Sequence, residues 1–463
     1  MDFDIIIIGS GPGGYVAAIR ASQLGMKTAI VERSELGGIC LNWGCIPTKS
    51  LLKSAEVLDK IRHAEDYGIS LTGDIKADFK KIIERSRNAA SDMSKGVNFL
   101  MKKNKIEVIQ GFGRIPGKGK VEVTDEKDGV KTYSAKNIII ATGARSRELP
   151  GLKQDGKKVI GYRQAMTLDE KPGKMVVVGS GAIGTEFASF YNSMGTEVTL
   201  VEYMPEIVPN EDIDVSKALA RSLKKSGIKI FTDSSVTSVD RSGEKCKVTI
   251  KTPGKEEIKE ADIVLSAVGI SPNTENIGLE ELGVEMEKGF IKVDKFMRTN
   301  IEGIYAIGDV VPTPALAHLA SAEGITCVEK IAGMNPEPVD YGNVPGCTYT
   351  SPEVASVGIT EKKAREAGYE IRVGKFPFTA SGKARAAGAK DGFVKLIFDE
   401  KHGELLGAHM IGANVTEMIS EIVVGKKLEV TGQEIIKSIH PHPTMSEAIM
   451  EAAADAFDEV IHL

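Results

Sequence analysis

Hydrophobic and polar positions follow the same order in two stretches of the chain. In the first, an apolar run at residues 4–8 precedes a glycine-rich turn, a helix-like segment of small residues and a second apolar run that ends at Glu32. In the second, the run at 175–178 opens the same order, which ends at Glu202. Short apolar runs bounded by glycine turns are typical of buried parallel strands. The pattern predicts two strand–turn–helix–strand repeats.

The turn of each repeat carries the spacing G-x-G-x-x-G. Its glycines are Gly9, Gly11 and Gly14 in the first repeat and Gly179, Gly181 and Gly184 in the second. The acidic residue that ends each repeat lies 18 positions after the third glycine, from 14 to 32 and from 184 to 202. Such glycines allow a tight turn and a close approach to a pyrophosphate at the helix N-terminus. A single copy also occurs in purely connecting turns, but two copies with equal spacing predict two dinucleotide sites.

Glu32 and Glu202 stand where a carboxylate accepts a hydrogen bond from a ribose hydroxyl. At the second site, Glu202 would repel the extra phosphate of NADP, so the sequence favours NAD there. The alternative is a solvated strand end, which the repeated spacing makes the weaker interpretation.

Three later apolar runs, at 137–145, 261–273 and 303–311, also end in glycine turns. Alternating strands before the first of them predict an inserted sheet. The third run ends in Asp309, at a position where doubly wound folds place ligands. Asp309 either accepts a hydrogen bond from a polyol or caps a turn, and the spacing leaves both interpretations open.

The pattern changes after residue 340. Apolar and polar residues alternate there as in antiparallel strands, and residues 412–428 and 445–460 have the pattern of amphipathic helices. The sequence therefore predicts a separate α+β domain at the end of the chain.

Composition narrows the function classes. The net charge is −5 and the basic residues are spread along all 463 positions, so we expect no nucleic-acid or membrane partner. The N-terminus lacks a basic region before its apolar run, and no apolar run reaches about 18 residues, which predicts a soluble, cytoplasmic protein. Five cysteines are too few for a disulfide framework, and three of them are assigned to packing: Cys246, Cys327 and Cys347.

The other two cysteines, Cys40 and Cys45, lie in the stretch GGICLNWGCIPTK at 37–49. Their C-x4-C spacing does not match zinc sites, and a staple across so short a loop adds little stability, so we expect no metal. Pro47 suits a first helical turn, so Cys45 should lie near a helix N-terminus, where the dipole and Lys49 favour a thiolate. The environment predicts a redox couple.

The stretch 37–49, the two dinucleotide motifs, ATGA, AIGD and the terminal HPHPTMSE resemble, in the same order, the flavin-dependent pyridine nucleotide disulfide oxidoreductases. The resemblance covers essentially the whole chain. It implies FAD in the first site, NAD in the second, and a disulfide in which Cys45 faces the flavin and Cys40 exchanges with substrate. Trp43 replaces a valine common there; we expect it in the loop, affecting packing and leaving the chemistry alone.

The implied fold class is α/β, with two Rossmann-like dinucleotide-binding domains and a C-terminal α+β dimerisation domain. Its expected segments are 1–147 (first segment of the FAD-binding domain), 148–272 (NAD-binding), 273–340 (central, completing the FAD site) and 341–463 (dimerisation). Lys49 and Glu186 would form an ion pair at the flavin ring. Further implied cofactor contacts are Arg33, Gly113, Thr142, Gly143, Val236, Gly269, Asp309 and Ala317.

The terminal motif implies an acid–base pair. In the resembling family the histidine before Pro-Thr is the base and a glutamate five positions later orients it, which gives His442 and Glu447. Thr444 and Glu447 also read as a T-x-x-E capping box, and the two roles for Glu447 are compatible. His440 is expected to be non-catalytic. The family forms homodimers in which this histidine reaches the disulfide of the other subunit.

The resemblance implies oxidation of protein-bound dihydrolipoamide to lipoamide with reduction of NAD+, within 2-oxo-acid dehydrogenase or glycine cleavage complexes. Glutathione reductases share the cysteines and the histidine but have arginines where this chain has VEYMPE, and mercuric reductases end in a cysteine pair where this chain ends VIHL. A non-enzymatic flavoprotein would not need both cysteines, His442 and Glu447.

Overall fold

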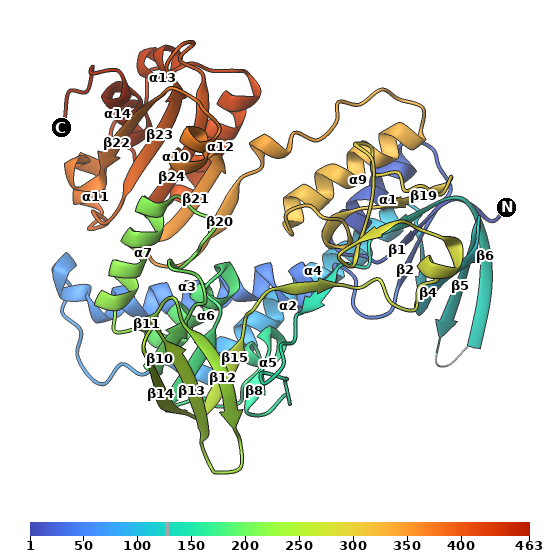
Figure 1. Ribbon diagram of the computed structural model, residues 1–463, viewed down its shortest axis with the longest axis horizontal. Coiled ribbons are helices and arrows are strands. Elements are labelled where there is room, and N and C mark those ends of the chain that lie inside the picture. Colours follow the sequence, from blue (N-terminus) through green and yellow to red (C-terminus); the bar gives the residue numbers. More distant parts are fainter. Residues whose placement is uncertain (126–128) are drawn as a thin grey trace. The chain divides into compact units, whose positions relative to one another are not determined.

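The computed structural model of the chain describes residues 1–125 and 129–463, which form two compact units. The first unit consists of Met1–Leu51, Lys80–Arg147 and Gly269–Val339, and the second of Leu52–Phe79, Glu148–Val268 and Asp340–Leu463. Sheets covered by helices confirm the predicted α/β class (Figure 1). The expected division at residues 147, 272 and 340 stays a prediction.

A parallel sheet forms the centre of the first unit. Its strands, in spatial order, are β3 (Glu107–Gln110), β2 (Thr28–Glu32), β1 (Phe3–Ile8), β6 (Gly129–Ile140) and β19 (Ile304–Ala306). The four isoleucines of β1 are all buried, because both faces of the strand are covered. The N-terminal half of β6 pairs antiparallel with β5 (Lys120–Asp125), which pairs with β4 (Phe112–Gly117), and these strands are the predicted inserted sheet.

Two helices of the first unit, α1 (Pro12–Gln23) and α9 (Ala317–Ile331), lie side by side (Figure 1). Small residues make this possible, since a Cβ added at Gly324 would lie 2.8 Å from the carbonyl oxygen of Gly13. An ion pair of 2.6 Å between Arg20 and Glu329 closes the contact further along the helices. The packing fixes the start of α1, which follows the first glycine turn.

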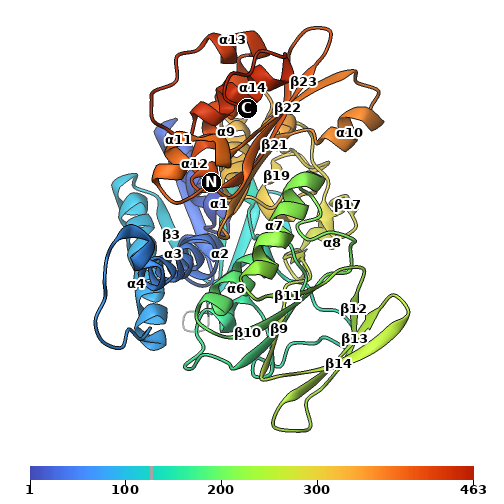
Figure 2. The same cartoon turned by 90° about the vertical axis from the view of Figure 1, so that its left-hand side faces the viewer.

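The second unit repeats the parallel arrangement. Its sheet has the order β11 (Lys229–Phe231), β10 (Glu197–Val201), β9 (Lys174–Val178), β15 (Ile263–Ser266) and β8 (Val159–Ile160). The helix α6 (Ala182–Ser193) follows the second glycine turn, and α7 (Ile213–Lys225) follows β10. A separate antiparallel sheet, prominent in Figure 2, contains β12 (Ser235–Asp240), β13 (Cys246–Thr252) and β14 (Lys255–Ala261).

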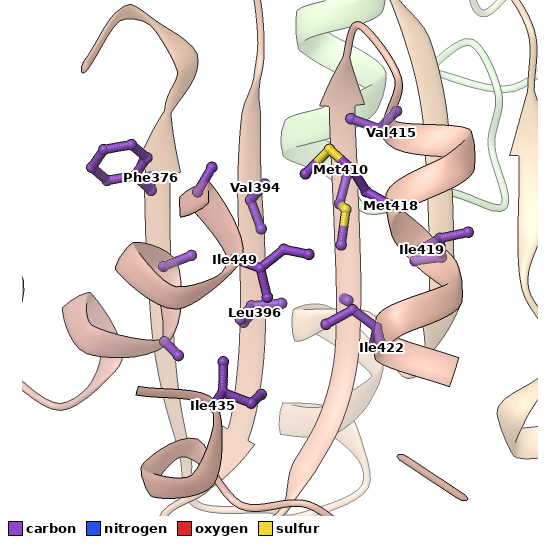
Figure 3. Packing of buried hydrophobic residues seen from close by; sticks show 14 of the residues in the cluster. Phe376, Val394, Leu396, Met410, Val415, Met418, Ile419, Ile422, Ile435 and Ile449 are labelled. Carbon is purple, nitrogen blue, oxygen red and sulfur yellow. The ribbon is translucent and has the colours of Figure 1, made fainter. Parts of the chain in front are cut away.

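The C-terminal part of the second unit is built on an antiparallel sheet. Its order is β20 (Gly346–Thr348), β21 (Glu353–Gly358), β24 (Leu405–Gly412), β23 (Phe393–Asp399) and β22 (Ile371–Pro377). The helices α12 (Val415–Lys427) and α14 (Glu447–Ala456) pack on this sheet through an aliphatic core that includes Leu396, Met410, Ile419 and Ile449 (Figure 3). The predicted α+β arrangement is confirmed.

Shorter elements and long connecting helices complete the chain. They are α2 (Gly38–Trp43), α3 (Cys45–Arg62), α4 (Phe79–Lys103), α5 (Tyr162–Ala165), α8 (Leu279–Leu282), α10 (Glu361–Glu366), α11 (Gly382–Ala386), α13 (Gly432–Lys437), β7 (Ala144–Ser146), β16 (Ile270–Pro272), β17 (Met286–Glu287), β18 (Phe290–Ile291), and the 3-10 helices η1 (Ala64–Tyr67), η2 (Gly308–Val310), η3 (Tyr341–Asn343) and η4 (Phe378–Ala380). Among the described residues, no helix combines the length and the apolar composition that crossing a bilayer requires.

A buried charge cluster joins α7 to the antiparallel sheet of the second unit. The Lys395 side chain on β23 is 2% exposed, and its Nζ lies 2.9 Å from Asp212, 3.1 Å from Asp214 and 2.8 Å from Glu361. Asp212 also caps α7 by accepting the backbone N–H of Asp214. The lysine charge is therefore compensated by three carboxylates, as a buried cation requires.

Glu211 directly precedes Asp212 of this cluster, and among the described residues it forms no ion pair. Its Oε2 is shielded from solvent and has no hydrogen-bond partner among the described residues, although part of the residue is exposed. Burial, with a smaller contribution from the charge of Asp212, raises the pKa of Glu211 from 4.5 to about 7, against the effect of a hydrogen bond with Ser356. Near neutral pH this carboxyl group is therefore poised between its two protonation states.

We expect Glu211→Gln to stabilise the protein at pH 8 by about 1–2 kcal/mol, and by much less at pH 5. Between pH 4.5 and 7 the folded state holds a proton on Glu211 that the unfolded state has lost, so wild-type stability falls as pH rises through this window. Above pH 7 the cost of the buried charge is fully present, and the amide removes it. Urea unfolding of both proteins at the two pH values measures the difference; an equal effect at pH 5 and pH 8 would contradict the assignment.

Candidate functional site

The two cysteines of the motif form a disulfide between two consecutive helices. Cys40 lies on α2 and Cys45 is the first residue of α3, with their Cα atoms 4.7 Å apart. Gly44 separates the helices, and a Cβ there would lie 3.3 Å from the Cα of Cys40, tighter than side chains normally pack. The absence of a side chain at this position lets the two cysteines meet. The disulfide implied by the resemblance is thus present.

The expectation of a loop around Trp43 was wrong. Residues 38–43 form the short helix α2, and Trp43 is its last residue. The amide of Asn42 donates to the carbonyl oxygens of Leu36 at 2.9 Å and Gly38 at 3.0 Å, which stabilises the turn locally. The glycines that flank the segment suggested a loop because they disfavour long helices, but here they only mark the ends of one short helix.

The remaining cysteines lie outside this disulfide. Cys246 and Cys327 are buried, and burial raises the pKa of both thiols, which keeps them protonated. Cys347 is half-buried on β20. Within the described residues, no group of three or more His, Cys, Asp and Glu side chains is placed to hold a metal ion.

The first glycine turn has the shape of a pyrophosphate cradle. Gly9 has a φ of +104°, and a Cβ there or at Gly14 would collide with a backbone carbonyl oxygen. Gly11, which precedes α1, has nothing within 4 Å of an added Cβ, so the helix N-terminus opens onto free space. Backbone N–H groups and the positive end of the helix dipole face that space and favour an anion.

The second glycine turn reproduces these features in the second unit. Gly179 has a φ of +96°, added Cβ atoms at Gly179 and Gly184 would collide with carbonyl oxygens, and Gly181 has open space before α6. Both turns therefore fit the phosphates of a dinucleotide.

Two serines that sequence reasoning missed organise these turns. The Oε2 of Glu32 accepts hydrogen bonds from the Ser10 backbone N–H at 3.0 Å and hydroxyl at 2.6 Å. The Oε2 of Glu202 accepts the same pair from Ser180, at 2.7 and 2.6 Å. A signal existed, since the residue between the first two glycines is serine in both repeats. Each carboxylate also accepts one further backbone N–H through Oε1, which leaves lone-pair capacity for a ribose hydroxyl.

Ser10 also connects the disulfide segment to the first turn. The backbone N–H of Gly37 donates to the Ser10 carbonyl at 3.1 Å and to its hydroxyl at 3.2 Å. A Cβ added at Gly38 would lie 2.6 Å from the Cα of Gly11, so the start of α2 lies directly against the glycine turn. The redox-active segment and the first dinucleotide turn are thus one packed structure.

A third ligand position expected in the first unit is the turn after β19. There the buried Glu323 of α9 accepts the N–H of Gly308 at 2.7 Å and the hydroxyl of Thr313 at 2.9 Å. Sequence reasoning missed Glu323, because it lies 15 positions from the glycine that it holds. Burial raises the pKa of the neighbouring Asp309. Glu323 therefore holds the turn, and the contact of Asp309 with a ligand hydroxyl stays a prediction.

The other expected cofactor residues of the first unit lie on several elements. The Thr142 hydroxyl donates to the Asn273 carbonyl at 2.6 Å, and the Gly143 carbonyl accepts the Asn273 N–H at 2.8 Å. The remaining ones are Arg33, exposed after β2, Lys49 on α3, Gly113 on β4 against Ile8 and Val31, Gly269 before β16, and Ala317 at the start of α9.

In the second unit, Val236 lies on β12 and Glu186 on α6. The buried Glu186 carboxylate accepts the backbone N–H of Tyr349 at 2.9 Å. Lys49 belongs to the first unit and Glu186 to the second, so their expected ion pair stays a prediction.

The terminal motif brings His442 and Glu447 together. The Nδ1 of His442 lies 2.8 Å from Oε1 of Glu447, and the Thr444 N–H donates to Oε2 at 2.7 Å. The Thr444 hydroxyl donates instead to the carbonyl of Pro441, so only half of a capping box forms and the two roles of Glu447 coexist. Burial opposes ionisation of Glu447, but these hydrogen bonds outweigh it and lower its pKa. The His442 side chain is 78% exposed and faces solvent in the single chain.

His440 is held differently. Its Nε2 lies 2.8 Å from Glu421, its side chain is 5% exposed, and the hydrogen bond with Glu421 raises its pKa. The exposed imidazole of His442 is available to a reacting group, whereas that of His440 is enclosed.

Comparison with known proteins agrees with this site. The family "Pyridine nucleotide-disulphide oxidoreductase" matches residues 3–324, and its dimerisation domain matches 344–453. The dihydrolipoyl dehydrogenase of Rhizobium etli is 53% identical, and that of Zymomonas mobilis 50%, each over 99% of both chains. The crystal structure of LpdA from Mycobacterium tuberculosis superposes with a TM-score of 0.90 at 28% identity, covering 97% of this chain and 98% of that one.

We expect Ser180→Ala to raise the Kd for NAD+ about 5- to 30-fold, because Glu202 loses a charge-assisted hydrogen bond worth about 1–2 kcal/mol and would turn away from the ribose predicted there. Ser10→Ala is the matched variant in the other repeat, and it should weaken retention of FAD and leave the affinity for NAD+ unchanged. Calorimetric titration with NAD+ and the bound flavin absorbance measure the two effects. Equal effects of both variants on one nucleotide would contradict the division of roles.

Proposed function

Because the chain belongs to the pyridine nucleotide-disulphide oxidoreductase family, we propose that it has dihydrolipoyl dehydrogenase activity: it oxidises protein-bound dihydrolipoamide to lipoamide and reduces NAD+ to NADH. The observation that carries the proposal is the disulfide between Cys40 and Cys45, which places a redox-active pair at the start of a helix and against a dinucleotide turn. Relatives that carry this activity in their names align over the full chain.

FAD and NAD are the cofactors of the family, and both glycine turns fit a dinucleotide. We assign FAD to the turn at Gly9–Gly14 with Glu32, and NAD to the turn at Gly179–Gly184 with Glu202, because the disulfide segment contacts the first turn. Bound FAD supplies a two-electron acceptor for the cysteine pair, and bound NAD+ supplies the final hydride acceptor. The protein positions these groups.

The chemistry of the chain itself is a thiol–disulfide exchange. One thiolate of dihydrolipoamide attacks Sγ of Cys40, the bond between Cys40 and Cys45 breaks, and Cys45 leaves as a thiolate stabilised by the N-terminus of α3. The second substrate thiol then attacks the substrate sulfur of the mixed disulfide, which closes lipoamide and releases Cys40. The substrate loses two electrons and the cysteine pair gains them.

His442 accepts the proton of the attacking substrate thiol. The Glu447 carboxylate is only an acceptor, so Nδ1 of His442 carries its hydrogen toward Oε1 and Nε2 is left with the lone pair that takes up a proton. Glu447 thus fixes the tautomer in the way that the carboxylate of a catalytic triad does. The matched dimerisation domain supports a homodimer, and we place His442 opposite the disulfide of the other subunit.

We propose that the protein is cytoplasmic. As its partners we propose the lipoyl domains and cores of 2-oxo-acid dehydrogenase or glycine cleavage complexes. This assignment rests on the shared activity of the relatives, because dihydrolipoamide is attached to lipoyl domains where it is reduced.

We expect purified enzyme to turn over dihydrolipoamide with NAD+ and not glutathione disulfide with NADPH, in steady-state assays run side by side. Cys40→Ser and Cys45→Ser should each lose activity at least about 1,000-fold and keep bound FAD, since the exchange needs both sulfurs. Cys347→Ser is the matched control, and we expect full activity. Activity only with glutathione disulfide, or normal turnover in either variant of the pair, would overturn the proposal.

We expect His442→Gln to slow dihydrolipoamide oxidation about 100- to 10,000-fold, because general base catalysis by histidine is lost. Oxidation of NADH by an artificial acceptor should be unchanged, since that reaction bypasses the thiol exchange. His402→Gln, at an exposed histidine, serves as the control. Comparable slowing of both reactions in His442→Gln would show that the histidine acts on folding or cofactor binding instead.

A further inference from the structure

The helix that carries Cys40 is short and flanked by glycines. α2 spans six residues, begins at Gly38 directly after Gly37, and precedes Gly44. The φ values of Gly37 and Gly38 are +96° and +61°. A helix of this length has little stability of its own, so contacts with its surroundings fix its position. Its first end is attached to the dinucleotide turn through the Gly37 N–H and Ser10.

A side chain from another helix contacts the far end of α2. Arg87, half-buried on α4, donates from Nη1 to the carbonyl oxygen of Asn42 at 2.7 Å. Its guanidinium also lies 4.0 Å from the centre of the Trp43 ring. A planar guanidinium suits this combination of stacking and hydrogen bonding, and partial burial strengthens the attraction to the ring. Arg87 thus contacts the last two residues of α2. Both helices, α2 and α4, are labelled in Figure 2.

The neighbours of Arg87 on α4 bind a different helix. The Ser86 hydroxyl donates to the carbonyl oxygen of Pro47 at 3.0 Å, and Arg85 donates to the Ser50 carbonyl at 2.8 Å. Both acceptors belong to α3, which is 18 residues long and carries Cys45. Cys45 therefore stands on a firmly anchored helix whether the disulfide is closed or open.

The side-chain bonds within α2 do not replace the contact with Arg87. The Asn42 amide donates to the carbonyls of Leu36 and Gly38, so these bonds support the beginning of α2, and Arg87 is what links its end to α4. Once the disulfide opens, α2 is still attached at Gly37, through the buried side chain of Leu41 and through Gly44 to α3, and Arg87 adds the link from its end to α4. Without Arg87, the end of α2 would lose its link to α4 and would have more freedom to move at Gly44, which would lengthen the average distance between Cys40 and Cys45.

We propose that Arg87, stacked on Trp43, is a positioning residue that keeps the Cys40 thiol beside Cys45 in the reduced enzyme. In this way it influences the reduction potential of the cysteine pair. The proximity of two thiols favours their disulfide, since closing the bond then costs less conformational freedom. This gives Trp43 a part in the chemistry, where the sequence suggested packing alone. The inference rests on the redox role of the cysteine pair in the proposed function.

The test compares the disulfide potentials of the wild-type and Arg87→Met holoenzymes. Each is equilibrated without oxygen in mixtures of reduced and oxidised dithiothreitol, quenched with acid, and alkylated after denaturation. Mass spectrometry then counts thiols, three when the disulfide is closed and five when it is open. Dithiothreitol is used because its reaction does not depend on the physiological substrate.

In Arg87→Met we expect the effective concentration of the Cys40 thiol beside Cys45 to fall about three- to tenfold. The reduction potential of the disulfide then becomes less negative by about 15–30 mV, at 29.6 mV per tenfold change for two electrons. Arg85→Met is the matched control, two positions away on α4, and its potential should equal that of the wild type. Arg87→Lys keeps the charge and should recover part of the shift. Trp43→Ala removes the ring on which the guanidinium stacks and leaves α4 intact, so it should shift the potential in the same direction.

The outcomes separate the positioning role of Arg87 from the redox role of the cysteine pair. Unchanged potentials in Arg87→Met and Trp43→Ala would overturn the positioning role, as would an equal shift in Arg85→Met. A wild-type disulfide that stays closed at every buffer ratio would overturn the redox assignment and, with it, the proposed function. If Arg87→Met does not accumulate as folded holoenzyme, Trp43→Ala against Arg85→Met decides the question.

Discussion

The hydrogen bonds of Ser10 connect three segments of the first unit on which the candidate site depends. The hydroxyl and backbone N–H of Ser10 donate to the carboxylate of Glu32 at the end of β2. Its hydroxyl and carbonyl oxygens accept the N–H of Gly37 at the start of the disulfide segment. Ser10 therefore links the first glycine turn, the carboxylate of Glu32 and the cysteine-bearing helix. The glycines around it are needed because the backbone segments approach more closely than a Cβ allows.

The second unit uses carboxylates for a different purpose. Asp212 caps a helix and neutralises Lys395, while Glu447 divides its two oxygens between an imidazole and a backbone N–H. In both cases one carboxylate serves structure and charge at once. A carboxylate with four acceptor positions makes this possible, so a capping motif in the sequence does not exclude a catalytic role for the same residue.

The sequence predicted the features that are fixed by local spacing. The glycine turns and the acidic residues that end each repeat depend on residues close together in the chain, and their strands and helices lie where the patterns indicated. The pair His442 and Glu447 came from the family resemblance, because spacing alone favoured a capping box. Contacts between distant segments left no pattern: Glu323 holds Gly308 from another helix, and Arg87 reaches Asn42 across 45 positions. The short helix α2 was missed because tertiary contacts, not propensity, stabilise six residues between glycines.

The two Ser–Glu pairs have the same atoms and nearly the same distances, although one repeat lies in each unit. The Ser–Glu pairs by themselves therefore give no basis for distinguishing the two proposed dinucleotides. Discrimination has to come from the side chains next to each acidic residue, where the chain has Arg33 in one repeat and Tyr203 in the other. The two repeats share the same glycine turn and Ser–Glu pair and differ in the side chains beside it. We therefore expect substitutions at these neighbouring side chains to change ligand preference without altering the turn.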